Sequence, residues 1–278
     1  MIKSILIGVD GSQYTDAVLQ YGIKMAHAFD ARLRVITVID VRIFEWSVYM
    51  GVDGFAPVFP SSVYLDESRN LLNQKADSVL AKCEEFLKKE NVDFTVEKIE
   101  GAPVDVICEK ANVSDLVVLG AHGEFARWGT KMMGATTEAI SRQCEKPLFI
   151  APQQVRHIQK ILVPYDGSRN SNRALPMAGF FGSKFGASLV IFTVDENSEK
   201  ANGIASEGKE YLSAYDIQVD IQTRKGDPDS EIVNFSEEGD FDLIIMGAYG
   251  HSRIKEAILG STTERVMRNA KIPVVLVK

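Results

Sequence analysis

The stretch Ile-Lys-Ser-Ile-Leu-Ile-Gly-Val-Asp-Gly-Ser, residues 2–12, decides the fold. A short apolar run closed by Asp10 and a Gly-Ser pair is typical of a buried β-strand that ends in a tight turn. The same pattern returns as Ile-Gln-Lys-Ile-Leu-Val-Pro-Tyr-Asp-Gly-Ser at residues 158–168. A strand and its turn that recur 156 residues later indicate that the chain repeats a whole unit.

Three further segments recur in the same order. Gly-Ala-Pro at 101–103 matches Gly-Asp-Pro at 226–228, and Asp-Leu-Val-Val-Leu-Gly-Ala-His-Gly at 115–123 matches Asp-Leu-Ile-Ile-Met-Gly-Ala-Tyr-Gly at 242–250. Lys-Pro-Leu-Phe-Ile-Ala at 146–151 matches Ile-Pro-Val-Val-Leu-Val at 272–277. Ordered matches of this kind indicate a duplication. We therefore predict two domains, residues 1–155 and residues 156–278.

The first copy is longer than the second by about 31 residues. We place this insert around residues 42–70, between the second strand and the Gly-Ala-Pro turn. The stretch contains aromatic residues, glycine and proline, and it shows no clear periodicity. Two interpretations stay open: a lid or contact surface, and an ordered excursion packed on its own domain.

Each copy alternates short apolar runs with amphipathic segments. The predicted strands are Ser4–Val9, Leu33–Ile39, Phe94–Glu100, Leu116–Gly120 and Leu148–Ala151 in the first copy, and Lys160–Val163, Ser188–Val194, Val219–Arg224, Leu243–Gly247 and Val274–Val277 in the second. The helical spacing of apolar residues is clearest over Asp66–Glu90. This alternation predicts an α/β fold of two tandem, doubly wound, Rossmann-like domains, each with a five-stranded parallel sheet.

Glycine and hydroxyl residues follow the fourth strand of the second copy: Gly247, Gly250, Gly260, Ser261 and Thr262. Glycines leave backbone amides open to a phosphate chain, and the N-terminus of a helix favours anions. Ser261 and Glu264 fit a capping box, which marks Ser261 as the start of a helix. Asp166 ends the first strand at the same rim of the sheet, where its carboxylate suits a ribose hydroxyl or adenine.

The spacing Gly-x2-Gly-x9-Gly-Ser, together with Pro-Tyr-Asp-Gly-Ser at 164–168, resembles the ATP-binding signature of the universal stress protein family. The resemblance covers both copies. It implies that ATP, or ADP or AMP, with or without Mg²⁺, is held mainly in the C-terminal domain. The residues implied are Pro164, Asp166, Val194, Gly247, Gly250, Gly260, Ser261 and Thr262. The alternative for the glycines is ordinary turn chemistry beside a helix cap.

The first copy departs from this signature. Ten residues, not nine, separate Gly123 from Gly134, and Ala135 removes the hydroxyl. An extra residue re-aims the amides beyond it, so we expect weak or absent nucleotide binding, a smaller ligand, or a scaffold role. The positions that would form this weaker second site are Asp10, Val38, Gly120, Gly123, Gly134 and Thr136.

The last strand of each copy is an apolar candidate for a sheet edge, and such edges tend to pair. In single-copy members of the resembled family two chains pair through this strand. The tandem can satisfy the same pairing within one chain, which predicts an internal pseudo-dimer with a pseudo-twofold axis. A homodimer of the whole chain, through the insert at 42–70, is a further hypothesis. No protein partner can be named from the sequence.

The resemblance implies a nucleotide-binding regulatory protein that acts under stress. Slow ATP hydrolysis is one alternative, although no general base or metal carboxylate is evident, so we assign no catalytic residue and no metal site. A scaffold that binds no nucleotide is another. The Ser-Gly-Gly-x-Asp-Ser and His-x-Gly-His loops of adenylate-forming and sulfur-transfer enzymes do not occur in the sequence.

Composition narrows the partners and the compartment. The net charge of −7 and the isoelectric point near 5.3 argue against a nucleic-acid footprint. No apolar run reaches the ~20 residues of a bilayer span, and the N-terminal stretch, broken by Asp10, does not read as a signal peptide. Three widely spaced cysteines without a Cys-x-x-Cys motif indicate free thiols in a reducing compartment. We expect a cytoplasmic protein.

Overall fold

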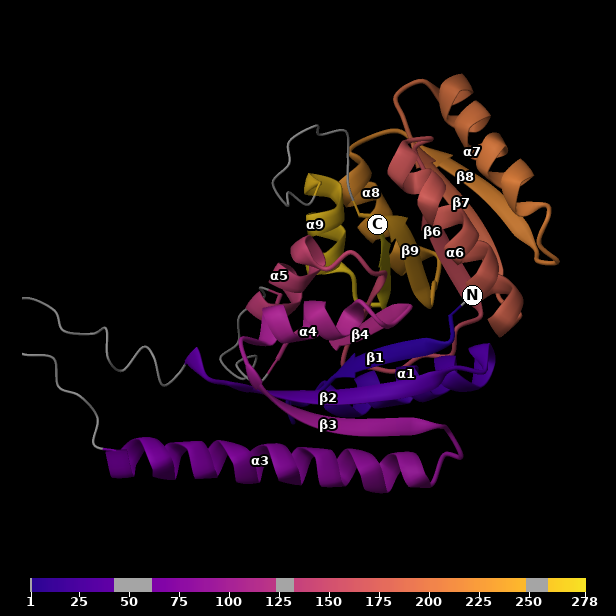
Figure 1. Ribbon diagram of the computed structural model, residues 1–278. Helices are drawn as coiled ribbons and strands as arrows, with labels where there is room; N and C mark the ends of the chain where they lie inside the picture. Colours follow the sequence, from indigo (N-terminus) through magenta and orange to yellow (C-terminus); the bar gives the residue numbers. More distant parts are fainter. Residues whose placement is uncertain (1, 43–61, 124–132, 249–259) are drawn as a thin grey trace, which may run out of the picture.

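The computed structural model describes residues 2–42, 62–123, 133–248 and 260–278. Helices and strands alternate along the N-terminal half (Figure 1). In chain order its elements are β1 (Ser4–Gly8), α1 (Thr15–Phe29), β2 (Arg32–Asp40), α3 (Ser62–Lys88), β3 (Phe94–Gly101), α4 (Pro103–Ala111), β4 (Leu116–Gly120), α5 (Ala135–Gln143) and β5 (Leu148–Ala151).

The C-terminal half repeats this order. Its elements are β6 (Lys160–Pro164), α6 (Arg169–Phe185), β7 (Ser188–Val194), α7 (Ser198–Leu212), β8 (Val219–Arg224), α8 (Pro228–Glu238), β9 (Leu243–Gly247), α9 (Ser261–Asn269) and β10 (Val274–Val277). The ten predicted strands are confirmed, and no end differs by more than one residue. Most of them are short apolar runs bounded by Gly, Pro and Asp, a pattern typical of buried parallel strands, whereas the edge strands β3 and β8 alternate apolar and polar residues.

All ten strands join one sheet, in the order β3-β2-β1-β4-β5-β10-β9-β6-β7-β8. The pairs within each half are parallel, as in β1 with β2 and β6 with β7. The halves meet where β5 and β10 pair antiparallel, with Phe149 opposite Val275. The order of one half mirrors the other across this join, so the predicted doubly wound halves and their pseudo-twofold relation are confirmed. The two predicted five-stranded sheets form one continuous sheet.

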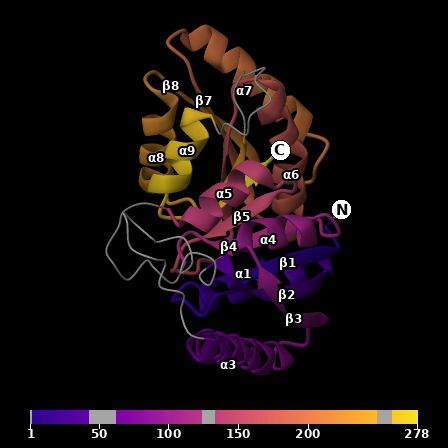
Figure 2. The same cartoon turned by 60° about the vertical axis from the view of Figure 1, so that its left-hand side comes forward.

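Helices cover both faces of the sheet (Figures 1 and 2). The core on one face includes residues of α1, α3, α6 and α7, and the core on the other face includes residues of α4, α5, α8 and α9. Crossovers of one hand place α1 and α3 on one face, where the chain steps from β1 to β2 and β3, and α4 and α5 on the other face, where it turns back to β4 and β5. Among the residues described, no helix combines the length and the apolar character needed to cross a bilayer.

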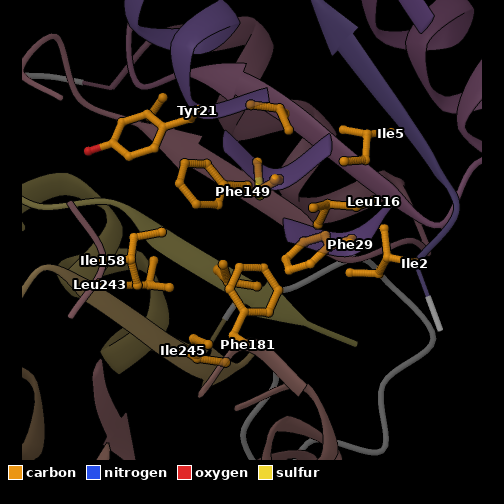
Figure 3. Packing of buried hydrophobic residues seen from close by; sticks show 14 of the residues in the cluster. Ile2, Ile5, Tyr21, Phe29, Leu116, Phe149, Ile158, Phe181, Leu243 and Ile245 are labelled. Carbon is orange, nitrogen blue, oxygen red and sulfur yellow. The ribbon is translucent and has the colours of Figure 1, made fainter. Parts of the chain in front are cut away.

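The join between the halves is packed with aromatic rings on the face that carries α1 and α6 (Figure 3). The ring centroids of Tyr21 and Phe149 lie 5.0 Å apart, and those of Phe29 and Phe181 also lie 5.0 Å apart. All four side chains are almost completely buried. Burying a ring of this size stabilises a fold by about 1.5–3 kcal/mol. The halves therefore share one core on this face.

Helix α3 begins earlier than the sequence indicated. It runs from Ser62 to Lys88, whereas the periodicity pointed to residues 66–90. The last part of the stretch taken as an irregular insert, residues 62–70, is therefore helical. Residues 43–61 of that insert lie outside the described residues.

Candidate functional site

A cavity of about 500 Å³ lies at the carboxyl ends of β1, β2 and β4 in the N-terminal half. Its walls include the turn after β1, the end of β2, the segment after β4 and the first turn of α5. The six positions predicted for the second site all line it: Asp10, Val38, Gly120, Gly123, Gly134 and Thr136. Parallel α/β sheets bind ligands at this edge. The structure brings the six positions together around one cavity.

The turn after β1 explains the Asp-Gly-Ser sequence. The Ser12 N–H donates to Asp10 Oδ1 at 2.9 Å, and the Gly11 N–H donates to Thr15 Oγ1 at 3.1 Å. Gly11 has φ of +76°, a left-handed conformation that glycine adopts without strain. A Cβ at this position would lie 2.6 Å from Cγ2 of Val79 in α3. The turn thus holds Asp10 at the cavity wall while it packs closely against α3.

The segment after β4 approaches this turn closely. A Cβ on Gly123 would lie 2.8 Å from Asp10 Oδ2, and a Cβ on Gly134 would lie 3.2 Å from the Gly123 nitrogen. Thr137 Oγ1 donates to the Gly120 carbonyl at 2.8 Å and so fixes the start of α5 against the end of β4. A side chain at Gly123 or Gly134 would displace its neighbours by a small amount, so glycine favours this close approach in addition to any role toward a ligand.

Helix α5 begins at the cavity. Its N-cap residue is Gly134, and no side chain caps the helix. The first amides of a helix have no partner within it, and the helix dipole gives this end a partial positive charge. Ala135 and Thr136 both line the cavity. An anionic group held in the cavity would therefore meet the positive end of α5.

One wall of the cavity comes from α3, and the sequence did not predict it. Leu72, Ala76 and Val79 supply apolar surface and Lys75 supplies a cationic group. The spacing of the apolar three is helical and was visible in the sequence. Which strands the helix would cover depends on tertiary packing, and the observed α3 packs along β2 and β3. A cationic group in the cavity wall favours an anionic ligand.

Further polar groups line the same cavity. Asp40 is one of them, and Arg42, which lies outside the lining, donates to it through Nε at 2.8 Å and Nη2 at 2.7 Å; these bonds hold the pKa of Asp40 below its usual value. The rings of Tyr14 and His122 lie 5.4 Å apart, and burial raises the pKa of Tyr14. With the valine, isoleucine and leucine side chains around them, these groups suit a ligand that has a flat apolar part and a charged part.

The C-terminal half repeats the first turn. The Ser168 N–H donates to Asp166 Oδ1 at 3.0 Å, Gly167 has φ of +73°, and Ser168 caps α6 by accepting from the Ser171 N–H. Desolvation raises the pKa of Asp166, but hydrogen bonds from Ser168 and Ser171 outweigh it, and the pKa is lowered. Asp166 is therefore a carboxylate at neutral pH, as its predicted role requires.

The other predicted positions of this half lie at the same rim. Pro164 ends β6, Val194 ends β7 and Gly247 ends β9. A Cβ on Gly247 would lie 2.5 Å from the Asn170 carbonyl, so the glycine is needed where β9 passes α6. Thr263 Oγ1 donates to the Gly247 carbonyl at 3.3 Å, the counterpart of the Thr137 bond.

Three predicted positions lie where α9 begins. Gly260, Ser261 and Thr262 stand at the N-terminal end of α9, the counterpart of the α5 end that lines the cavity in the other half. Gly250 falls within residues 249–259, outside the described residues.

The predicted start of a helix at Ser261 is confirmed, but the predicted capping box does not form. The N-cap residue of α9 is Gly260, no side chain caps the helix, and Ser261 is the first helical residue. Glu264 instead forms an ion pair with Arg268 at 2.8 Å. Because α5 also starts on a glycine, Ala135 removes no cap, and the two helices begin alike. The capping-box pattern misplaced the cap by one residue, since a glycine in extended conformation serves equally well.

The two helices that begin at these rims also touch each other across the join. Arg142 of α5 lies 2.7 Å from Glu138 and 3.6 Å from Glu264 of α9, and Arg268 of α9 lies 3.2 Å from Glu138. With the pair inside α9, four residues form a symmetric network of alternating charge. The side chains are partly exposed, so each pair contributes at most about 1 kcal/mol. No sequence pattern predicted this network.

Within the described ranges, no three His, Cys, Asp or Glu side chains gather where they could hold a metal ion. The fold and the two rims define the class: a tandem, doubly wound α/β protein with a glycine-rich rim in each half.

Comparison with known proteins gives the family. The model of the universal stress protein family matches residues 1–152 and 157–278. The chain therefore belongs to the universal stress protein family, in its tandem form. A universal stress protein of Synechocystis sp. is 29% identical over 283 aligned positions, which cover 98% of this chain and 99% of the relative. One of Mycolicibacterium smegmatis is 23% identical and covers 99% of this chain and 96% of the relative.

A solved structure shows the same fold. The crystal structure of a universal stress protein from Archaeoglobus fulgidus superposes with a TM-score of 0.75 at 23% identity, and the match covers 99% of this chain and 98% of that one.

Proposed function

We propose that the protein binds adenine nucleotide, ATP or its di- and monophosphate forms, at the rims of both halves and acts as a regulatory protein of the stress response. The observation that carries this proposal is the cavity at the carboxyl ends of β1, β2 and β4. Its volume of about 500 Å³ falls within the usual range for ligand pockets, about 300–1,000 Å³. It is lined by the positions that the family signature singles out.

The base and the ribose would occupy the apolar part of the cavity. Val9, Ile36 and Val38 offer surface for a flat ring, and the end of β2 offers backbone groups to its edge. The Asp10 carboxylate stands beside them and suits the ribose hydroxyls. The corresponding groups of the C-terminal half are Val194 and Asp166.

The phosphates would lie over the glycine-rich segment and the N-terminal end of α5. Gly120, Gly123 and Gly134 line the cavity without side chains that would shield their amides. The α5 dipole and Lys75 supply positive potential there. In the C-terminal half Gly247, Gly250, Gly260, Ser261 and Thr262 would take this role, and Mg²⁺ could accompany the phosphates. Its unbroken signature leads us to propose the C-terminal half as the tighter site.

We propose regulation rather than catalysis as the role of the bound nucleotide. Among the described cavity residues, no carboxylate cluster is placed to hold a metal ion for phosphoryl transfer. We also propose a cytoplasmic location and a division of the chain at residues 155 and 156, both on the sequence argument.

A matched set of four variants tests this proposal. Gly134 and Gly260 are the N-cap residues of α5 and α9, and Asp and Asn are both favoured at such positions, so the helices are expected to form. Gly134→Asp and Gly260→Asp place a negative charge where the phosphates would bind. Gly134→Asn and Gly260→Asn are neutral controls of equal size.

Titration calorimetry with ATP is the measurement. We expect two binding events in the wild-type chain, each Asp variant to weaken one of them at least about tenfold, and each Asn variant to weaken it less. Loss of the tighter event in Gly260→Asp would assign that event to the C-terminal half. A wild-type chain that binds no ATP at millimolar concentration, with its fold intact by circular dichroism, would contradict the proposal.

A further inference from the structure

Two of the three cysteines meet in the folded chain, although 36 residues separate them in the sequence. Cys108 lies on α4 and Cys144 is the residue that follows α5 as its C-cap. The two thiols are hydrogen-bonded to each other, with Cys108 donating to Cys144. The third cysteine, Cys83, belongs to the core on the opposite face of the sheet. The molecule therefore holds one thiol pair and one isolated thiol.

Basic groups surround the Cys144 sulfur. The Lys146 N–H hydrogen-bonds to it, and the charges of Lys146 and Lys278 act on it. Lys278, the last residue of the chain, also donates through Nζ to the Cys144 carbonyl. The thiol pair thus lies where the end of the C-terminal half touches α5 of the N-terminal half.

These contacts shift the pKa values of the two thiols in opposite directions. The Cys108 hydrogen bond and, after it, the backbone and lysine contacts lower the pKa of Cys144, despite the opposing effect of burial. The hydrogen bond to Cys144 and burial raise the pKa of Cys108. Cys83 is different, because burial and the nearby Asp16 raise its pKa to about 11. A thiolate is the reactive form of cysteine, so reactivity is directed to Cys144.

We propose that Cys108 and Cys144 form a reversible disulfide when the protein meets a hydroperoxide. The geometry that carries this is the packing of α4 on α5, which places Cys108 and Cys144 in the same core on the face that carries these helices, with Lys278 bound to the Cys144 carbonyl. Cys108 is partly exposed, which gives the pair an approach from solvent, whereas Cys144 is only 2% exposed. The proposal does not depend on nucleotide binding.

The chemistry balances with one peroxide. The Cys144 thiolate attacks one peroxide oxygen, so an S–O bond forms, the O–O bond breaks, and the leaving oxygen takes a proton. Cys108 then attacks the sulfenic sulfur of Cys144, so the S–S bond forms and the S–O bond breaks. The hydroxide leaves as water with the Cys108 proton. The thiols lose two electrons and the peroxide gains them, and a dithiol reductant reverses the change by exchange.

The bond would cross-link two walls of the cavity. Pro103 and Ile107 of α4 line the cavity, as does the first turn of α5. Cys108 follows Ile107 directly, and Cys144 ends the helix that begins at Gly134. A disulfide here ties α4 to α5 and limits the movement of one against the other.

The duplication supplies an internal control. Val233 of α8 and Ala270, the C-cap of α9, occupy the positions that match Cys108 and Cys144. Both are packed against the core of the same face. The repeated fold therefore accepts aliphatic side chains at both positions. For this reason we expect Cys108→Val and Cys144→Ala to fold.

Thiol counting on the full chain tests the proposal. The reduced protein is treated with hydrogen peroxide, unfolded, alkylated with N-ethylmaleimide and analysed by intact mass and peptide mapping. We expect two of the three thiols to escape alkylation, a linked peptide pair that contains Cys108 and Cys144, and full recovery with dithiothreitol. Cys83→Ser should give the same linked pair, and Cys108→Val or Cys144→Ala should abolish it.

Two outcomes would overturn the proposal. The first is alkylation of all three thiols after a peroxide treatment that oxidises a free model dithiol completely. The second is a linked pair that includes Cys83, or one that forms as fast in urea-unfolded chain as in the folded protein, since the folded contact would then not direct the reaction.

Discussion

The two halves share the same order of strands, helices and turns. They differ in the side chain that lies beneath the helix that follows the second strand. In the N-terminal half Val9 lines the cavity, and the 27-residue α3 forms one of its walls. In the C-terminal half the matching residue is Tyr165, whose ring packs under the 15-residue α7 within 3.1 Å of where a Cβ on Gly208 would lie. Its hydroxyl donates to Asn172 Oδ1 at 2.6 Å. The two copies of a duplicated fold can therefore keep the same turns, while the size of one side chain under a helix alters the space next to those turns.

The two halves also differ in the spacing of the glycines that precede α5 and α9, but not in how these helices begin. The extra residue between Gly123 and Gly134 led us to expect a distorted rim in the N-terminal half. The structure nevertheless starts α5 and α9 on matched glycines and fixes both helices through a matched threonine. The extra residue falls in 124–132, outside the described residues, and the residues on either side of it keep the frame.

The largest expected effect is on the free energy of unfolding, at the β5–β10 pair that joins the halves. The two halves contribute side chains of different size there. Phe149 and Val275 lie opposite each other in the β5–β10 pair, and both are completely buried. Phe149→Ala should lower the free energy of unfolding by about 3–5 kcal/mol, because it removes the ring that packs on Tyr21. Val275→Ala removes only two methyl groups and should cost about 2 kcal/mol.

Urea unfolding of both variants measures these changes. Equal losses, or a larger loss for Val275→Ala, would contradict the asymmetry that the packing indicates.

The next effect concerns the cavity itself. Val38 lines the cavity at the end of β2, and its match in the C-terminal half, Val194, is also valine. Val38→Trp should fill part of the cavity with a ring. We expect the affinity of the N-terminal half for ATP to fall at least about tenfold, or 1.4 kcal/mol, without a change at the C-terminal half. Calorimetry in a Gly260→Asp background isolates the N-terminal event. Val38→Ile is the control, because it keeps the site aliphatic, and an equal loss with this variant would refute the size argument.

The smallest effect concerns the threonine that anchors each helix. Thr137→Val removes a hydrogen bond of 2.8 Å to the Gly120 carbonyl, and Thr263→Val removes one of 3.3 Å to the Gly247 carbonyl. Both threonines are buried, so each change should cost about 1 kcal/mol of stability, and the shorter bond should cost more. Thermal unfolding of the two variants measures both losses of stability. A larger loss for Thr263→Val than for Thr137→Val would contradict the order that the two bond lengths predict.

Local patterns predicted the strands and the rim because both depend on few neighbouring residues. Short runs bounded by turn residues gave each of the ten strands, and the repeated Asp-Gly-Ser and glycine motifs, together with the family resemblance, gave the six cavity residues. The pairing of β5 with β10 followed from two apolar strands that each needed a partner.

The features that sequence did not predict depend on packing between distant segments. The α3 wall, the Arg142 and Arg268 network and the contact of Cys108 with Cys144 each join residues far apart in the chain. The capping box failed for a different reason, since glycine in extended conformation took the cap. The homodimer and the role of residues 43–61 stay predictions.

Native mass spectrometry of the full chain with increasing ATP tests the central claim most directly, because it counts bound nucleotides on each molecule. The account predicts one adenine nucleotide per chain at low ATP and two at saturation, with one lost in Gly134→Asp and one lost in Gly260→Asp. A chain that carries a single nucleotide at saturation would contradict the two-rim proposal, and a chain that carries none would contradict nucleotide binding altogether.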